Sequence, residues 1–307
     1  MKNVKKILGG LIVVGVYLLY IFFGEEIGLT KEDVVNIKNK VIDSQVINVL
    51  PDGELRIHYL DVGQADSILI ENAGEYMLID AGNNEDGKLL VKYFKSLGIK
   101  KFAYLVGTHA HEDHIGGMDD IINNFEVSNF YMPDVVTTTK TFEDVIEALE
   151  NKNIYFDTPK IGDNFSFGGC NFLVLSVLND DSDLNDTSIV LRLVYGKNKF
   201  LFTGDATSAV EEEILKLGYD ISSDVYKVAH HGSEYSNSLK YLKKVNPSYS
   251  IISVGVDNSY NHPHNKAIKN LESVGSIIYR TDKDGTVIVS SDGENINISF
   301  KDTNLDG

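Results

Sequence analysis

The 307-residue sequence contains a single cysteine, Cys170, so no disulfide bond can form within the chain. This cysteine begins the apolar run CNFLVLSVL, which indicates a small, inert core residue rather than a reactive nucleophile. Low-complexity tracts are also missing, and hydrophobic residues make up 43% of the chain, which excludes a disordered or fibrous protein. A chain of this length can bury a substantial core, as one large domain or two smaller ones.

Positive charge is scarce, because 28 Lys and Arg residues accompany 45 Asp and Glu residues, a net charge of −17. Such a surface repels phosphate backbones, which argues against a passive DNA-binding module. The charge does not exclude an enzyme that contacts a phosphodiester through metal ions, since bound cations dominate the local field.

One long apolar run is present, at residues 7–23, with three lysines before it and two glutamates after it. Its length is at the short end for a membrane-spanning helix. The flanking charges predict a single-pass anchor in the cell membrane, with residues 1–6 in the cytoplasm and the remainder outside. A secreted protein with a cleaved signal peptide is the alternative. It is less favoured because bulky YIFF stands before Glu25, where cleavage requires small residues.

The rest of the chain divides into a spacer, one domain and a tail. Residues 24–53 are predicted as a partly helical juxtamembrane spacer, with Thr30 as a plausible N-cap. Residues 54–302 carry short β-rich runs separated by turns and helical patterns, and residues 303–307 form a tail. Two strand-rich passages, each with its own helices, predict an α/β sandwich of two sheets.

The individual elements follow from periodicity and turn residues. Helices are predicted at 84–98 and 207–218, ending at Gly98 and Gly218. The final segment, 275–300, is predicted as strands joined by turns at 283–285 and 292–293. The other predicted strands are 55–62, 66–72, 76–82, 100–109, 172–178, 187–195, 199–205 and 223–232.

Three of the eight histidines lie in the stretch THAHEDHIGG, directly after a predicted strand. Imidazole and carboxylate groups at this density are typical ligands of Zn²⁺, Mn²⁺ or Fe. In a tight loop His109 and His111 can chelate one ion while Asp113 and His114 face a neighbouring one. A solvated polar loop is the alternative, but nothing in turn formation requires three histidines.

This stretch resembles the signature of the metallo-β-lactamase superfamily, which implies an αββα sandwich with one or two metals at the sheet edges. Asp80, at the end of YMLIDAG, matches the superfamily's first motif, an Asp that steadies the metal loop. Asp205, in FLFTGDA, matches the Asp that bridges both metals. Asp205 can also serve as the N-cap of the helix that follows it.

The stretch KVAHHGS supplies the last ligand that the resemblance implies. His230 stands at the predicted strand end, so we favour it as the metal ligand. His231 would then point toward substrate or act as a proton donor, although the two neighbours leave the opposite assignment open.

Six ordered motifs narrow the resemblance to the soluble C-terminal domain of ComEC-type competence proteins and its stand-alone relatives, over roughly residues 55–289. These motifs are HYLDVGQADSILI, LNDTSIVLRL, LFTGDA, VAHHGS, SVGVDNSYNHPH and YRTDKDGTV. The first contains Asp61 and Asp66 as supporting residues, and Ala65 stands where the family commonly has Gly.

Two departures from the family pattern are visible. No histidine lies between Ile115 and Gly204, where the superfamily has a further metal ligand. Asn185 and Asp186 are the candidates for that place, and the weaker ligand makes Mn²⁺ plausible beside Zn²⁺. In addition, no multi-span channel accompanies the domain, so one membrane segment alone cannot transport DNA.

The motif NSYNHPH adds His262 and His264 near the predicted centre. His262 either contacts substrate or belongs to a turn before the next helix. Ser233 and His264 are candidates for residues that support the centre or bind substrate. Arg280, in YRTDKDG, is predicted to pair with an acidic side chain rather than clamp a phosphate.

The favoured function is a phosphodiesterase or nuclease with two divalent metal ions and a metal-bound hydroxide that attacks phosphorus. Asp113 could take up the proton, and His231 or His262 could protonate the leaving group. The resemblance implies DNA as substrate or, alternatively, a small or wall-linked phosphoester such as phosphorylcholine. Hydrolysis of an amide, thioester or lactone is a further alternative, since the fold hosts many reactions. The last is an inactive accessory that binds DNA or another polymer.

Overall fold

The computed structural model describes residues 53–178 and 183–301. The predicted membrane anchor at 7–23, all but the last residue of the spacer, and the tail lie outside these ranges. Within the ranges described, no helix combines the length and apolar character needed to cross a membrane.

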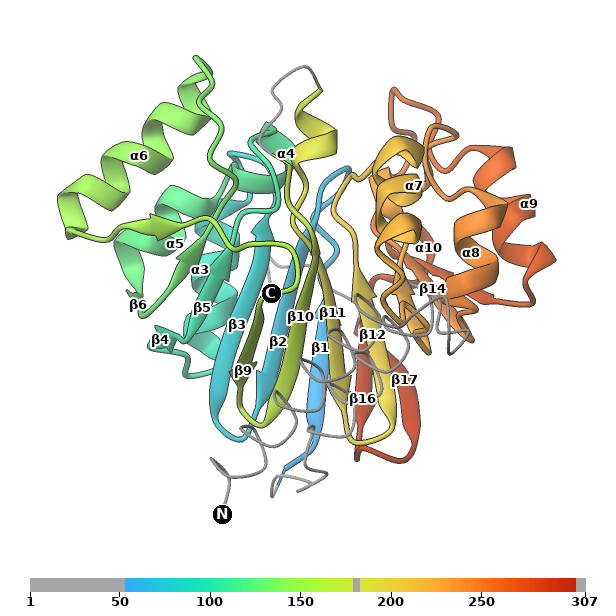
Figure 1. The fold of residues 1–307 in the computed structure, drawn as a ribbon. Coiled ribbons are helices and arrows are strands. Elements are labelled where there is room, and N and C mark those ends of the chain that lie inside the picture. The colour runs from blue at the N-terminus through green and yellow to red at the C-terminus, as the bar shows by residue number, and fades with distance from the viewer. Residues whose placement is uncertain (1–52, 179–182, 302–307) are drawn as a thin grey trace, which may run out of the picture.

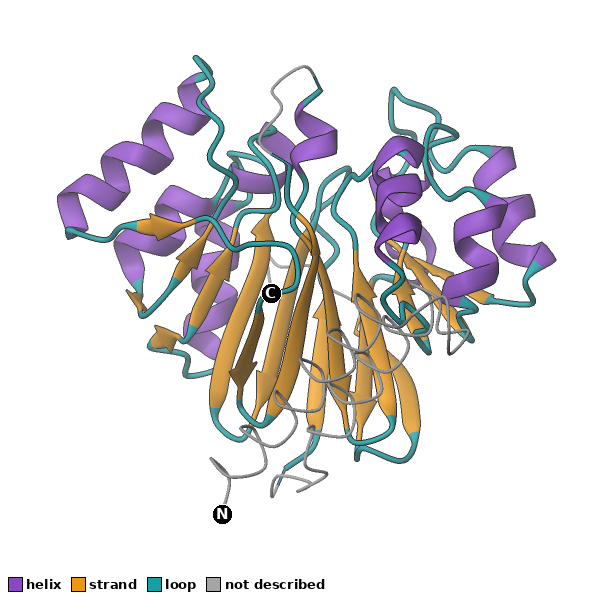
Figure 2. Cartoon of the chain, viewed as in Figure 1, coloured by secondary structure: helices purple, strands orange, loops and turns teal. Residues whose placement is uncertain are grey.

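Two β-sheets pack face to face in the middle of the domain, and helices cover their outer faces (Figures 1 and 2). The predicted αββα sandwich is therefore confirmed. In the first sheet the strands lie in the order β17 (Ile296–Lys301), β16 (Thr286–Ser291), β1 (Leu55–Tyr59), β2 (Ser67–Asn72), β3 (Glu75–Ala81), β5 (Tyr104–Val106), β7 (Phe130–Tyr131) and β8 (Phe156–Asp157). Four helices accompany it: α3 (Gly87–Ser96), α4 (Glu112–Ile115), α5 (Met118–Asn124) and α6 (Lys140–Lys152).

The second sheet contains the later strands and packs against helices of its own. Its order is β15 (Ile277–Arg280), β14 (Tyr249–Ile252), β13 (Val225–Lys227), β12 (Asn198–Phe202), β11 (Val190–Tyr195), β10 (Cys170–Ser176) and β9 (Asn164–Phe167). The accompanying helices are α7 (Ser208–Leu217), α8 (Leu239–Val245) and α9 (Asn265–Ser273). Two 3-10 turns, η1 (Leu184–Thr187) and η2 (Ala229–Gly232), lie in loops between strands and helices.

Apolar side chains on both faces of each sheet form three hydrophobic layers, one between the sheets and one between each sheet and its helices. In β2, Ile68 and Ile70 pack between the sheets, while Leu69 packs against the helices of the first sheet. Successive side chains of a strand point to opposite faces, so a strand buried on both faces is an uninterrupted apolar run. Cys170 is buried in the layer between the sheets, as its position in an apolar run predicted.

Two predicted segments are arranged differently in the structure. The single strand predicted at 100–109 is broken, because β4 (Lys101–Phe102) leaves the sheet to pair with β6 (Glu126–Val127) and β5 alone continues to the histidine cluster. Near the C-terminus, the predicted turn at 283–285 is part of a crossing from the second sheet to the first through α10 (Thr281–Asp284).

The crossing is stabilised by local side-chain bonds. Thr281 Oγ1 accepts from the backbone N–H of Val254 at 2.8 Å and donates to the carbonyl oxygen of Val254 at 3.0 Å. Arg280 Nε donates to Asp282 Oδ1 at 2.8 Å, so the predicted pairing of this arginine with an acid is confirmed.

The histidine loop is pressed against the loop after β3, and glycine at position 116 permits that approach. A Cβ on Gly116 would lie 2.2 Å from the carbonyl carbon of Asn83 and 2.3 Å from the nitrogen of Asn84, which are backbone atoms. The φ of Gly116 is −56°, so alanine there meets crowding alone and no conformational penalty.

We expect Gly116→Ala to lower the free energy of unfolding by about 3 kcal/mol or more, because backbone overlap cannot be relieved by a rotamer change. Gly74→Ala is the matched control: Gly74 has a φ of +79° and no neighbour within 4 Å, so only the strain of about 1–2 kcal/mol applies. Urea denaturation of both variants measures the difference, and equal losses would show that the loop accommodates the methyl group.

Candidate metal centre

Asp80, at the end of β3, holds the histidine loop that follows β5. Its Oδ1 accepts from the backbone N–H of Thr108 at 2.7 Å, and its Oδ2 accepts from Thr108 Oγ1 at 2.8 Å. The same Oδ2 lies 2.8 Å from His114 Nδ1. Asp80 has a φ of +59°, which is uncommon outside glycine and is maintained by this bonding. As a result, the ring of His114 is fixed with its Nε2 directed away from Asp80.

Asp205 brings the second half of the chain to the same place. It follows β12, is 2% exposed, and its backbone N–H donates to Ser188 Oγ at 3.1 Å. One carboxylate oxygen, Oδ1, lies 3.3 Å from His114 Nε2, and the other, Oδ2, lies 3.6 Å from His231 Nε2. The N-cap of α7 is Thr207 rather than Asp205, so the alternative role predicted for Asp205 is wrong.

The two histidines of η2 take opposite places from those we favoured from the sequence. His231 is the buried one, 1% exposed, and its Nε2 lies 3.3 Å from Asp113 Oδ2. The side chain of His230 is 22% exposed, and its Nε2 lies 3.7 Å from Asp205 Oδ2, nearly as close as that of His231, so burial and the contact with Asp113 distinguish the two. Both residues have a φ of +51°, so the chain turns sharply after β13 and directs the second ring inward.

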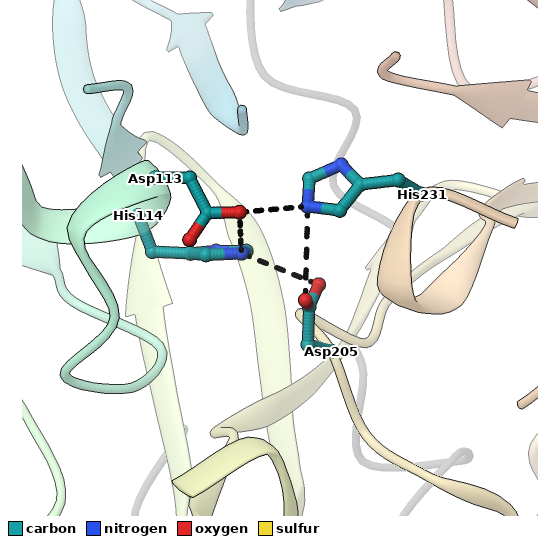
Figure 3. Close-up of side chains that lie close together, drawn as sticks. All are labelled: Asp113, His114, Asp205 and His231. Carbon is teal, nitrogen blue, oxygen red and sulfur yellow. Dashed lines mark ion pairs between the residues drawn. The ribbon is translucent and has the colours of Figure 1, made fainter. Parts of the chain in front are cut away.

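Asp113, His114, Asp205 and His231 therefore form one cluster, in which a ligand atom from each lies within 4.8 Å of every other (Figure 3). The marked separations run from 3.3 Å to 3.9 Å. Ligand atoms at the corners of a tetrahedral zinc shell are about 3.4 Å apart, given metal–ligand bonds of roughly 2.0–2.2 Å.

Three atoms of this cluster have no hydrogen-bond partner although they are buried: His114 Nε2, Asp205 Oδ1 and His231 Nε2. Buried polar atoms are almost always paired, because an unpaired one loses its hydration without compensation. Two imidazole nitrogens and two carboxylates suit borderline divalent metals. The cluster thus fits a divalent cation by spacing, by ligand type and by its unpaired atoms.

A smaller cluster lies beside the first. His109 Nε2 is 3.0 Å from His111 Nδ1, and the ring centroids of His109 and His114 are 4.1 Å apart. A further buried oxygen without a partner, Asn185 Oδ1, belongs to η1, which leads into the strand beside this loop. Asp186 is the other residue predicted to replace the missing histidine ligand. Its carboxylate accepts a hydrogen bond from Thr207 Oγ1 at 2.5 Å and so binds the start of α7 instead.

The histidines and carboxylates of the cluster lie within 4 Å of one another and therefore shift one another's pKa values. Burial on its own would lower the pKa of His114, but the carboxylates of Asp205, Asp80 and Asp113 outweigh it and raise that pKa well above its usual value. Burial would raise the pKa of Asp205, but His114 and the neighbouring histidines hold it well below its usual range. Burial lowers the pKa of His109, which keeps that ring neutral and able to act as a ligand.

A buried ion pair between Lys227 and Asp66 lies beside the cluster. From the sequence we predicted a supporting role for Asp66 but none for Lys227. Lys227 Nζ lies 2.7 Å from Asp66 Oδ2, and both side chains are at most 1% exposed. The other carboxylate oxygen of Asp66, Oδ1, accepts no hydrogen bond and lies 3.6 Å from His231 Nδ1. The backbone N–H of Asp66 donates to the carbonyl oxygen of Asp113 at 3.0 Å. A lysine inside the apolar strand VYKVA was the signal in the sequence, since buried lysines are rare unless paired.

The ring of His262 lies close to that of His231 in the cluster. Its centroid is 6.3 Å from that of His231, with planes 21° apart. Burial and the charges of His231 and His230 lower the pKa of His262 to about 4. The lowered pKa favours the neutral ring at neutral pH, and the proton-donor role of His262 stays a prediction.

The remaining predicted residues lie outside the cluster and shape its surroundings. Asp61 Oδ1 accepts from the backbone N–H of Gly63 at 3.3 Å, an arrangement within its own loop. Ser233 Oγ accepts from the backbone N–H of Tyr235 at 3.3 Å. His264 Nδ1 accepts from the backbone N–H of Glu234 at 3.0 Å, which joins two loops beside the cluster.

Glu211 of α7 anchors the η2 region, although nothing in the sequence singled it out. Its carboxylate accepts from the backbone N–H groups of Asn237 and Ser238, at 2.5 Å and 3.0 Å. The side chain of Asn237 in turn accepts from the backbone N–H of Ala229 and donates to its carbonyl oxygen, directly before the histidine pair. Burial raises the pKa of Glu211 to about 7.

The raised pKa of Glu211 predicts that stability declines with pH. A folded-state pKa above the unfolded value means that this group stabilises the fold fully below about pH 4.5, and that the contribution is lost as the pH rises through about 7. The change is on the order of 3 kcal/mol. We expect wild type, relative to Glu211→Gln, to lose stability between pH 4.5 and 8 in urea denaturation. Parallel pH profiles for the two proteins would contradict this account.

Comparison with known proteins agrees with the geometry. The family described as the Metallo-beta-lactamase superfamily matches residues 60–256. ComE operon protein 3 of Bacillus subtilis (strain 168) is 29% identical over 253 residues, which cover 76% of this chain and 33% of that protein. Competence protein ComA of Neisseria gonorrhoeae is 26% identical over 249 residues, covering 78% and 32%. The chain thus spans about a third of the length of these curated relatives.

Solved structures show the same fold. The metallo-β-lactamase fold protein YhfI from Bacillus subtilis is similar with a TM-score of 0.55 and 12% identity, covering 78% of this chain and 100% of that one. Igni18, a metallo hydrolase from Ignicoccus hospitalis, is similar with a TM-score of 0.50 and 18% identity, covering 76% and 98%.

Proposed function

Because the chain belongs to the metallo-β-lactamase superfamily, we propose that it is a metal-dependent phosphodiesterase that acts on DNA. The observation that carries the metal-dependent part is the set of unpaired buried atoms on His114, Asp205 and His231. The similarity to a competence protein supports a role in competence, and DNA is the substrate class that we propose for that role.

Asp113, His114, Asp205 and His231 would hold one divalent cation, and His109 and His111 with Asn185 would hold a second. Zinc and manganese both suit imidazole and carboxylate ligands. Divalent cations in such a centre lower the pKa of a bound water toward neutrality and neutralise charge on phosphate oxygens.

The chain's own residues then supply orientation. The side chain of Asp113 is 29% exposed while those of His114, Asp205 and His231 are at most 3% exposed, so Asp113 is the member of the cluster that faces incoming substrate. Its carboxylate stays ionised beside His114 and His231, which suits it to accept and direct a proton of the attacking water. His230, whose side chain is 22% exposed beside Asp205, would contact a phosphate oxygen of the substrate.

The test is the activity of the purified full-length chain, loaded with Mn²⁺ or Zn²⁺, on bis-p-nitrophenyl phosphate, single-stranded DNA and a β-lactam. We expect hydrolysis of both phosphodiesters and none of the lactam. Cleavage of the lactam alone would overturn the phosphodiesterase assignment in favour of the amide, thioester or lactone alternative.

A small or wall-linked phosphoester is the second candidate, and the net charge of −17 favours it, since an acidic surface repels a long phosphate backbone. p-Nitrophenyl phosphorylcholine distinguishes the two: faster turnover of this compound than of DNA would make the small substrate the better assignment. A chain that binds DNA tightly but retains no divalent metal would instead be an inactive accessory.

The membrane location is a separate proposal, based on the apolar run at residues 7–23 and its flanking charges. We expect the full-length chain to fractionate with membranes and its hydrolase domain to be digested by protease added to intact cells. Recovery of a shortened chain from the medium would support the secreted alternative.

A further inference from the structure

Three aromatic rings lead from the buried cluster to solvent. The planes of His231 and His262 are 21° apart with centroids 6.3 Å apart, and those of His262 and Tyr260 are 21° apart with centroids 5.7 Å apart. Offset-stacked aromatic pairs have centroid separations of this size. Exposure rises along the series, from 1% at His231 through 9% at His262 to 62% at Tyr260.

The middle ring is held firmly in place. Asn258 Oδ1 accepts from the backbone N–H of His262 at 2.9 Å, and Asn258 Nδ2 donates to its carbonyl oxygen at 2.7 Å. The ring of His264 packs edge-on against that of His262, with centroids 4.8 Å apart. Tyr260 therefore rests on a preorganised support, while most of its own surface remains available to a ligand.

The neighbouring loop contributes similar groups. Glu234 is joined to His264 by the backbone hydrogen bond already described, and Lys266 Nζ donates to the carbonyl oxygen of Glu234 at 3.0 Å. The next residue, Tyr235, is 68% exposed. Exposed aromatic rings are typical of surfaces that bind single-stranded nucleic acid, because every base has a face that can stack.

We infer that Tyr260, supported by His262, is a stacking platform for a nucleobase of single-stranded DNA whose phosphodiester lies at the metal centre. This inference rests on the proposed function. Stacking also suits an acidic protein: with a net charge of −17 the surface away from the metal centre repels the phosphate backbone, and base stacking adds affinity that does not depend on positive charge.

The sequence contains no tryptophan, which makes a direct optical test possible. Tyr260→Trp places the only tryptophan of the full-length, metal-loaded chain on the platform, where it can be excited selectively over the tyrosines. A short oligothymidylate with a phosphorothioate backbone, which resists cleavage, is the probe, and the same backbone without bases is its control. Tyr155→Trp is the matched variant, since Tyr155 is 86% exposed and lies in the loop between α6 and β8.

We expect the oligothymidylate to quench Tyr260→Trp, the abasic backbone not to, and Tyr155→Trp to respond to neither. Absent quenching, or equal quenching by both probes, would overturn the inference. As a second measurement, Tyr260→Ala is expected to raise KM for single-stranded DNA by roughly 5- to 150-fold with kcat unchanged, and Tyr260→Phe to retain the wild-type KM. An unchanged KM in Tyr260→Ala would also overturn it.

These outcomes are separable from the proposed function. If wild type hydrolyses phosphodiesters but Tyr260→Trp is not quenched, the platform is wrong and the enzyme assignment stands. If quenching depends on the base but no phosphodiester is cleaved, the platform stands and the phosphodiesterase assignment fails.

Discussion

Asp205→Asn is expected to lower the rate of hydrolysis strongly and to weaken metal binding. The carboxylate lies 3.3 Å from His114 Nε2 and 3.6 Å from His231 Nε2, so its loss removes both a ligand and the negative charge between two imidazoles. We expect kcat/KM on bis-p-nitrophenyl phosphate to fall on the order of 10³-fold, equivalent to about 4 kcal/mol. Metal content after dialysis is expected to fall with it.

Asp163→Asn is the control for this experiment, because it makes the same change of charge at an exposed loop carboxylate that accepts from the backbone N–H of Lys160. It is expected to keep both metal and activity. Retention of full metal content and activity by Asp205→Asn would show that this residue is not part of the metal centre.

Lys227→Met is expected to destabilise the fold by about 3–5 kcal/mol, because it leaves the carboxylate of Asp66 buried without its partner. Replacing both partners should be much less harmful, since Lys227→Met with Asp66→Asn leaves no uncompensated charge. Urea denaturation of wild type, each single variant and the double variant forms a complete cycle.

The stability of the double variant, compared with that of the two single variants, shows whether Lys227 and Asp66 interact. We expect the double variant to recover at least half of the stability lost in Lys227→Met. A double variant that is destabilised by the sum of its two single variants would mean that the pair is not coupled, despite a separation of 2.7 Å.

Much of the centre was predictable because its residues stand at strand ends. Asp80 lies at the end of β3, the loop of His109 to His114 follows β5, and Asp205 follows β12. Loops at one end of a sandwich meet, so polar residues that end apolar runs are expected to converge. The structure does bring them together, at the end of the sandwich where α4 lies in Figure 1.

Other features depend on geometry that a linear pattern does not contain. Choosing between His230 and His231 required the left-handed backbone of both residues, which turns the second ring inward. The sequence offered two candidates for the place of the missing histidine; in the structure Asp186 accepts a hydrogen bond from Thr207, which leaves Asn185 as the candidate. The crossing of the chain between sheets at α10 looked like a hairpin turn, because local turn residues do not reveal which sheet receives the next strand.

The most direct test of the metal centre is anomalous diffraction from crystals of the metal-loaded full-length chain, collected at the absorption edge of the bound ion. The account predicts an anomalous peak within bonding distance, roughly 2.0–2.3 Å, of His114 Nε2, His231 Nε2 and an oxygen of Asp205. A peak elsewhere, or no peak with these side chains in the positions described, would contradict it.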